Sequence, residues 1–121
     1  MNSEHFSYDI QHSHLSITPQ KNPENFHLEF TGLKFKGELR QLIEEKDQMD
    51  VLEVFEGSIE IKSLNILLYT HNPKTQSIDV RLNKNPVLFE KKIELDLLKI
   101  TLVEEILLDP QSKLLVHIKF L

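Results

Sequence analysis

The sequence predicts an all-β protein, a single antiparallel β-sandwich or flattened barrel of about eight to ten strands. Apolar and polar residues alternate along most of the chain from Phe6 to Leu121, and a period of two places alternate side chains on opposite faces of a strand. Short clusters of Asn, Asp, Pro and Gly interrupt this alternation repeatedly, as turns do. The 121 residues suffice for one hydrophobic core, so we expect one domain over residues 1–121.

The N-terminal third is expected to contain two strand regions separated by a loop. The first covers residues 6–17. Near residues 13–15 its apolar residues change from even-numbered to odd-numbered positions, which predicts a bulge or a bend. Residues 18–25 contain two prolines and two asparagines and form the loop. The second region covers 26–35, and its parity changes at Gly32, where we expect another bulge or a close backbone approach.

Residues 37–56 fit two different patterns. Their apolar residues make a helical stripe among good helix formers, so a short helix within 38–49 is one interpretation. The other is a hairpin with strands over 38–43 and 51–55 around a polar turn over 44–50. We favour the hairpin because the second of these strands contains two valines and a phenylalanine, which prefer strands.

In the C-terminal half, alternation predicts strand regions over residues 58–69, 78–83, 87–102 and 113–121. Turns containing Asn, Asp and Pro separate them, and the side chain of Asp109 can cap the last turn. The terminal strand alternates most regularly, and its expected core-facing residues are Leu114, Val116, Ile118 and Phe120.

The composition excludes several classes of protein. A net charge of −5 argues against a nucleic-acid partner, because phosphate binding needs clustered Lys and Arg. No apolar run approaches the ~20 residues of a membrane-spanning helix, and the N-terminal residues lack the basic and apolar regions of a signal peptide. The chain has no cysteine, which excludes disulfides and thiolate chemistry, and we expect a soluble cytoplasmic protein.

Two histidines are the strongest candidates for chemistry. His12 and His14 are two residues apart, so on a strand both imidazoles could reach one metal ion. A third ligand would have to come from elsewhere in the fold, from His5, Asp9, His27 or His117. We keep a metal-dependent enzyme using His12 and His14 as one hypothesis, and otherwise we expect no catalytic residue, no metal and no cofactor.

The charged clusters are typical of solvent-facing surface. Glu94 and Asp96 alternate with apolar residues, and paired carboxylates need a cleft to carry out acid–base chemistry. The six acidic residues within 44–56 do not follow the order of a Ca²⁺-binding loop, and they suit a solvated turn or a site for a basic partner. Lys34, Lys36 and Arg40 form a basic concentration, and Phe35 lies between the two lysines as a core residue of an amphipathic strand would.

Three functions are consistent with these observations, and we favour a non-catalytic protein-interaction module. Leu115 and Leu121 lie beside His117 on the nominally polar face of the terminal strand, and apolar residues on both faces of a strand indicate a second contact surface. Leu115, His117 and Leu121 are therefore the predicted interaction residues, used by a protein partner or by a homodimer. The first alternative is a small β-barrel carrier of an apolar ligand, and the second is the metal-dependent enzyme.

Overall fold

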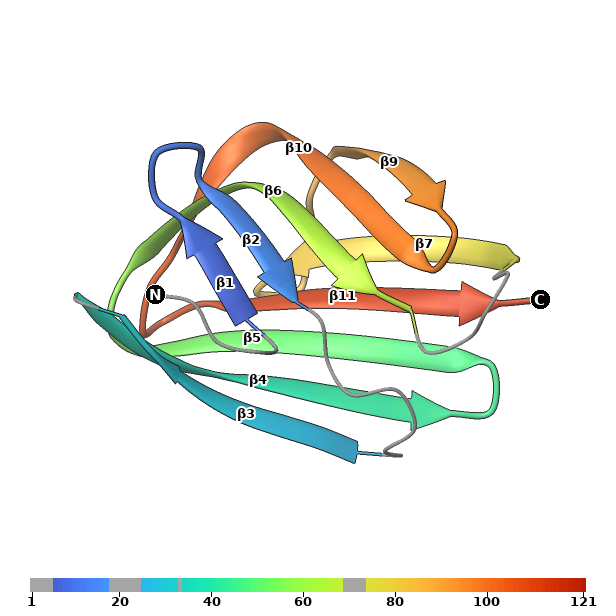
Figure 1. Ribbon diagram of the computed structural model, residues 1–121, viewed down its shortest axis with the longest axis horizontal. Helices are drawn as coiled ribbons and strands as arrows, with labels where there is room; N and C mark the ends of the chain where they lie inside the picture. The colour runs from blue at the N-terminus through green and yellow to red at the C-terminus, as the bar shows by residue number, and fades with distance from the viewer. Residues whose placement is uncertain (1–5, 18–24, 33, 69–73) are drawn as a thin grey trace.

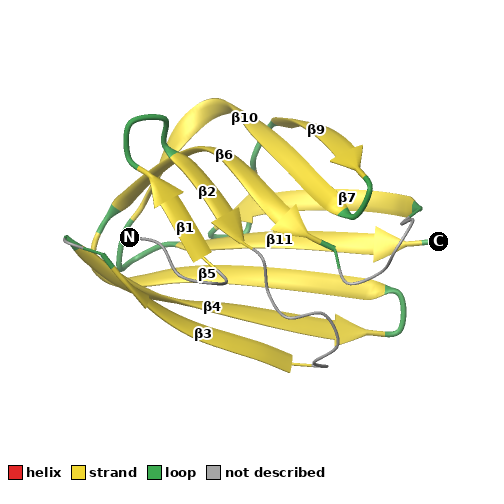
Figure 2. Cartoon of the chain, viewed as in Figure 1, coloured by secondary structure: helices red, strands yellow, loops and turns green. Residues whose placement is uncertain are grey.

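The computed structural model describes residues 6–17, 25–32, 34–68 and 74–121 (Figure 1). These residues form eleven strands in two sheets, and none of them is helical (Figure 2). The sheets lie face to face and neither closes on itself, so the architecture is the β-sandwich and not the flattened barrel. The part of the chain that is described contains no helix long and apolar enough to cross a membrane.

Both sheets are predominantly antiparallel. The five-stranded sheet has the order β1 (Phe6–Asp9), β2 (His14–Ile17), β6 (Ile59–Leu67), β10 (Leu97–Leu108) and β9 (Phe89–Glu94). The six-stranded sheet has the order β3 (Asn25–Thr31), β4 (Phe35–Glu44), β5 (Asp47–Gly57), β11 (Lys113–Phe120), β7 (Thr75–Leu82) and β8 (Asn85–Pro86). Among the described strands, only β2 and β6 pair in parallel.

The hydrophobic core fills the space between the two sheets. On β11 the four residues expected to face inward are all buried, with Val116 3% exposed and Ile118 fully buried. Facing them from the five-stranded sheet are apolar side chains of β2, β6 and β10 such as Leu15, Leu64 and Ile100, which are at most 1% exposed. The alternation of the sequence therefore identifies the inward face of the best-patterned strands correctly.

The hairpin interpretation of residues 37–56 is confirmed, and the alternative helix within 38–49 is wrong. From Gly37 onward β4 pairs with β5 without interruption as far as Glu44 opposite Asp47, so the turn consists only of Glu45 and Lys46. Glu45 takes the left-handed conformation (φ 46°) that such a tight turn requires. The polar turn expected over 44–50 is therefore too long, because most of it belongs to β5.

Turns account for both of the changes in alternation that were expected to mark a bulge, a bend or a close backbone approach. Residues 10–13 connect β1 and β2 as an antiparallel hairpin, and Ser13 has a positive φ of 50°. The chain also reverses after β3, where the Gly32 N–H donates to the Phe35 carbonyl at 2.8 Å. A turn changes the parity of inward residues just as a bulge does, so alternation alone cannot separate the two. The bulge in this region lies between Lys36 and Gly37.

The remaining turns follow the sequence more closely. Asp109 caps the last turn as expected, since its Oδ1 accepts hydrogen bonds from the Gln111 N–H and the Ser112 hydroxyl, both at 2.9 Å. The region expected over 87–102 is divided into β9 and β10 by a tight turn at Leu95 and Asp96. The loop residues 18–24 and the turn residues 71–73 lie outside the described residues.

Candidate interaction face

The outer face of the six-stranded sheet is organised in rows that cross β4, β5, β11 and β7. Alternate residues of each strand point away from the core, and the antiparallel register places four of them side by side. One row consists of Arg40, Val51, Leu115 and Arg81. The next row consists of Leu42, Met49, His117 and Asp79. We call the outward surface of these four strands the outer face.

The middle of the outer face is apolar. Leu42, Met49, Val51 and Leu115 are adjacent in these two rows, and we call them the apolar centre. Leu42 is 41% exposed and the other three are partly exposed, although all four side chains are apolar. Contiguous exposed apolar surface with a polar rim is typical of a contact site between proteins.

Charges of both signs surround the apolar centre. At one end, Glu53 Oε1 lies 2.6 Å from Arg40 Nη2 and 3.5 Å from Lys113 Nζ, so one carboxylate bridges two cations. At the other end, His117 Nε2 lies 3.0 Å from Asp47 Oδ1. Such partly exposed pairs contribute little to folding stability.

A solvent-open hollow of about 560 Å³ lies over part of this surface. Val51 and Leu115 form its apolar part, and its remaining lining residues are Arg40, Arg81, Asn83, Lys84 and Lys113. The Arg81 guanidinium donates to the Lys84 carbonyl at 3.3 Å, and no ion pair within the described residues neutralises Arg81 or Lys84. This corner is therefore locally basic on a chain whose net charge is −5.

The structure brings together two of the three predicted interaction residues. Leu115 lies in the apolar centre, and His117 follows it in the neighbouring row. Leu121 is 67% exposed but follows the end of β11, about 20 Å from Leu115 at the ~3.3 Å rise of a strand. Sequence reasoning missed Met49, which it placed in a polar turn, and it could not show which strands flank Leu115.

The candidate metal ligands do not share a strand face. His12 lies in the β1–β2 turn, and its Nδ1 is 2.7 Å from Asp9 Oδ2, a hydrogen bond that lowers the pKa of the Asp9 carboxyl. His14 begins β2, where its Nδ1 lies 2.6 Å from Ser63 Oγ and its Nε2 3.3 Å from Ser16 Oγ. Each imidazole therefore makes its own hydrogen bonds to neighbouring side chains, and the two rings share no partner.

The possible third ligands do not complete a site among the described residues. Asp9 is the partner of His12, and His117 lies on the outer face of the other sheet. His5 and the side chain of His27 are outside the described residues. Where the structure is described, no group of three His, Cys, Asp or Glu side chains is placed to hold a metal ion.

Glu94 and Asp96 do not lie on one strand, because Asp96 belongs to the turn between β9 and β10. Glu94 ends β9 and lies 2.8 Å from Lys92 Nζ and 2.9 Å from Lys99 Nζ. These hydrogen-bonded ammonium groups lower the pKa of Glu94 from 4.5 to about 2. A carboxylate held in this way remains ionised and cannot serve as a general acid near neutral pH.

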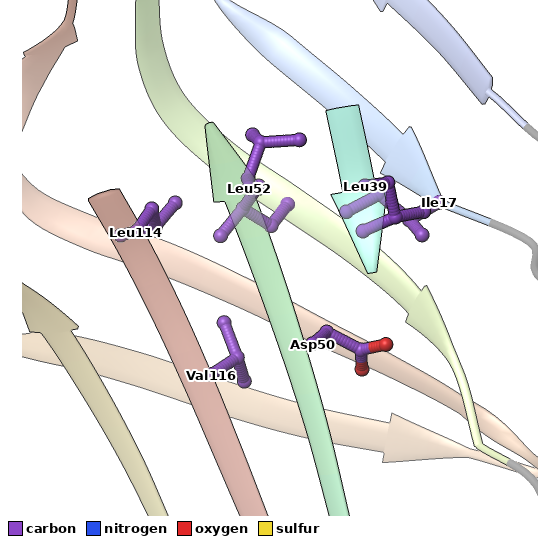
Figure 3. A pocket seen from close by; sticks show the side chains of 7 residues that line it. Ile17, Leu39, Asp50, Leu52, Leu114 and Val116 are labelled. Carbon is purple, nitrogen blue, oxygen red and sulfur yellow. The ribbon is translucent and has the colours of Figure 1, made fainter. Parts of the chain in front are cut away.

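The acidic run within 44–56 divides between surface and core. Glu44, Glu45 and Glu56 are exposed, whereas Asp50 is only 2% exposed. Asp50 points between the sheets into a cavity of about 10 Å³, where Figure 3 shows its carboxylate among apolar side chains. The lining residues are Ile17, Leu39, Leu52, Leu64, Leu114 and Val116.

Asp50 belongs to a buried polar network that joins the two sheets. Its Oδ2 accepts a hydrogen bond from Gln48 Nε2 at 2.9 Å, while its Oδ1 has no partner. Gln48 Nε2 also lies 3.3 Å from Gln41 Oε1 and 3.2 Å from the Leu67 carbonyl of β6. Burial raises the pKa of Asp50 from 3.8 to about 7. The group has no access for a substrate, so its consequence is for stability.

Other apolar side chains are exposed away from the outer face. Leu88, Val103 and Leu107 are at least half exposed around β9 and β10. At the other end of the sandwich, Tyr8 and Phe35 pack edge to face, with ring centroids 5.8 Å apart, beside the 78% exposed Ile10.

No protein-family model matches this chain, and no curated protein has a sequence that matches it. Its function must therefore be inferred from the geometry of the core and the outer face.

Proposed function

We propose that this protein is a non-catalytic protein-interaction module that binds its partner through the outer face of the six-stranded sheet. The observation that carries the proposal is the apolar centre, four apolar side chains that are at least partly exposed inside a rim of both charge signs. Interfaces between proteins combine an apolar middle with a polar, solvent-accessible rim. The surface is contributed by paired strands of the sandwich, so it is preorganised for docking.

The geometry offers less support for a carrier of an apolar ligand. Sites for small ligands usually enclose roughly 300 Å³ or more. The cavity beside Asp50 measures about 10 Å³, and its walls are core side chains in contact with one another. A ligand of even a few carbon atoms would have to separate the sheets.

The metal-dependent enzyme is also less well supported. His14 uses both ring nitrogens on serine hydroxyls, and His12 uses one on Asp9. Rearranging both imidazoles toward one ion would break these hydrogen bonds, and a third ligand would still be required.

Site-specific photo-cross-linking tests the proposed function. A photoreactive amino acid at Val51, in the apolar centre, should form a covalent adduct with a protein in the native cell, mapped by mass spectrometry. The same group at Leu95, which is 86% exposed in the β9–β10 turn, is the control and should form none. Adding Leu115→Glu to the Val51 variant should abolish the adduct, because a carboxylate in the apolar centre would have to be buried unpaired.

The opposite pattern would contradict the proposal. Equal adducts from Val51 and Leu95, or adducts from Val51 that survive Leu115→Glu, would show that the outer face is no preferred contact site.

A further inference from the structure

We propose that the occupant of the outer face is a second copy of this chain, related to the first by a two-fold axis parallel to the β5–β11 ladder. This inference rests on the proposed function, since it names the partner of the same surface. It is carried by the order of charged and apolar side chains along these two strands.

The two central strands of the outer face have matching patterns of opposite charge. Where β5 pairs with β11, its outward residues are Glu53, Val51, Met49 and Asp47. Those of β11, paired with them in the same order, are Lys113, Leu115, His117 and Lys119. Each end of the ladder therefore has an acid on β5 and a base on β11, with Val51, Met49, Leu115 and His117 between them.

A two-fold axis between β5 and β11 makes this pattern complementary to itself. Rotation by half a turn places β5 of one copy over β11 of the other without changing the position along the strands. Glu53 then faces Lys113 of the second copy, and Asp47 faces Lys119 of the second copy. Val51 meets Leu115 of the second copy, while Met49 faces His117 and Leu42 faces Asp79, so half of each apolar centre meets the apolar centre of the other copy.

The alternative in-plane axis, perpendicular to the strands, is disfavoured by the same charges. It would reverse the order along each strand and place Glu53 over Asp47 of the second copy. Lys113 would meet Lys119, again a pair of like charges. Like charges in contact cost binding energy and act against the wrong arrangement, so the charge pattern selects the axis parallel to the ladder.

The flanking strands limit the strength of this contact. In the favoured arrangement Arg40 on β4 faces Arg81 of the second copy, which is a pair of like charges. Arg40 is partly neutralised by Glu53 at 2.6 Å and by Glu38 at 3.7 Å, and this pair lies at the solvent-exposed rim. Four strands by four rows cover about 19 Å by 27 Å, or about 500 Å² of sheet plane, at standard strand spacings. This is small for a stable interface, so we expect a dimer that dissociates in the micromolar range.

Sedimentation velocity over a concentration series tests the two-fold arrangement. The wild-type chain should shift from monomer to dimer as concentration rises. Lys119→Glu creates two like-charge contacts per dimer, since symmetry repeats each one, and should weaken association by about tenfold. Adding Asp47→Lys restores opposite charges and should bring the dissociation constant back to within about threefold of wild type. Lys91→Glu, an exposed position on β9, changes the net charge equally and should have no such effect.

Several outcomes would overturn the inference. These are a monomer at every concentration, equal weakening by Lys91→Glu, or no recovery in the double variant while circular dichroism shows all variants folded. A monomer whose Val51 position still cross-links to a different protein would refute the two-fold dimer and leave the interaction module standing. Failure of both measurements would refute both.

Discussion

Replacing Asp50 by Asn should flatten the dependence of folding stability on pH. The Asp50 carboxyl is buried between the sheets, and its pKa is raised from 3.8 to about 7. The folded protein therefore holds this proton more tightly than the unfolded chain does. Its destabilising effect is absent below the unfolded pKa, grows as the pH rises through about 4 to 7, and is complete above the folded pKa.

The size of this effect follows from the difference between the pKa values of Asp50 in the folded and unfolded chain. A rise in the pKa of Asp50 from 3.8 to about 7 corresponds to roughly 4 kcal/mol of lost stability once the folded carboxyl is ionised. Between pH 5 and pH 8, Asp50 alone should lower the free energy of unfolding by about 2–3 kcal/mol. Asn keeps an oxygen that can accept the hydrogen bond from Gln48 Nε2 but cannot ionise, so this contribution should disappear.

Urea unfolding at pH 5 and pH 8, at a concentration low enough for monomers, measures the difference. The wild type should lose stability relative to Asp50→Asn on going to pH 8, and the Asn variant should be the more stable protein there. Asp79→Asn, at an exposed carboxylate, is the matched control and should keep the wild-type pH dependence. Identical pH dependence in the wild type and Asp50→Asn would refute the reasoning, because it would mean that Asp50 titrates as an exposed group.

Three further expectations concern the core, the hairpin and the histidines. Val116→Ala should cost about 1–3 kcal/mol in denaturant unfolding, and a loss of only a few tenths would mean that this side chain is not packed in the core. Gly37→Ala should cost about 1–3 kcal/mol, because its Cβ would overlap the Glu53 carbonyl oxygen, whereas an unchanged midpoint would show that β4 can shift. A strong chelator should leave the thermal midpoint unchanged, and a large drop would revive the metal site at His12 and His14.

The sequence predicted the fold class because the core faces of most strands are local patterns. Alternation on β11 requires no knowledge of its neighbours, and all four of its expected inward residues are buried. Turns were less predictable, since a parity change at Gly32 has the same appearance whether the strand bulges or reverses. The hairpin at residues 37–56 was predicted correctly, but the predicted turn was too long because Gln48 and Asp50 are polar.

The buried network and the candidate site depend on pairing between distant segments. Burial of Asp50 is tolerable only because Gln48 hydrogen-bonds to it and Gln41 lies in the facing position on β4. Leu115 could be identified from the sequence alone, because it is an apolar residue on the nominally polar face of its own strand. Its neighbours Val51 and Arg81 come from strands far along the chain, and the order of strands in a sheet is not encoded in local periodicity.

The distance between spin labels in two copies tests most directly whether the outer face is where the copies meet. With the axis between β5 and β11, labels at Ser77 on β7 should have Cα atoms about 18 Å apart, from ~4.8 Å strand and ~10 Å sheet spacings. Labels at Thr101, outward on the five-stranded sheet, should be separated by about 30 Å or more, because two further sheet spacings lie between them. A short distance at Ser77 with a long one at Thr101 is the predicted result. A short distance at Thr101, or no intermolecular distance at either position in concentrated samples, would contradict the account.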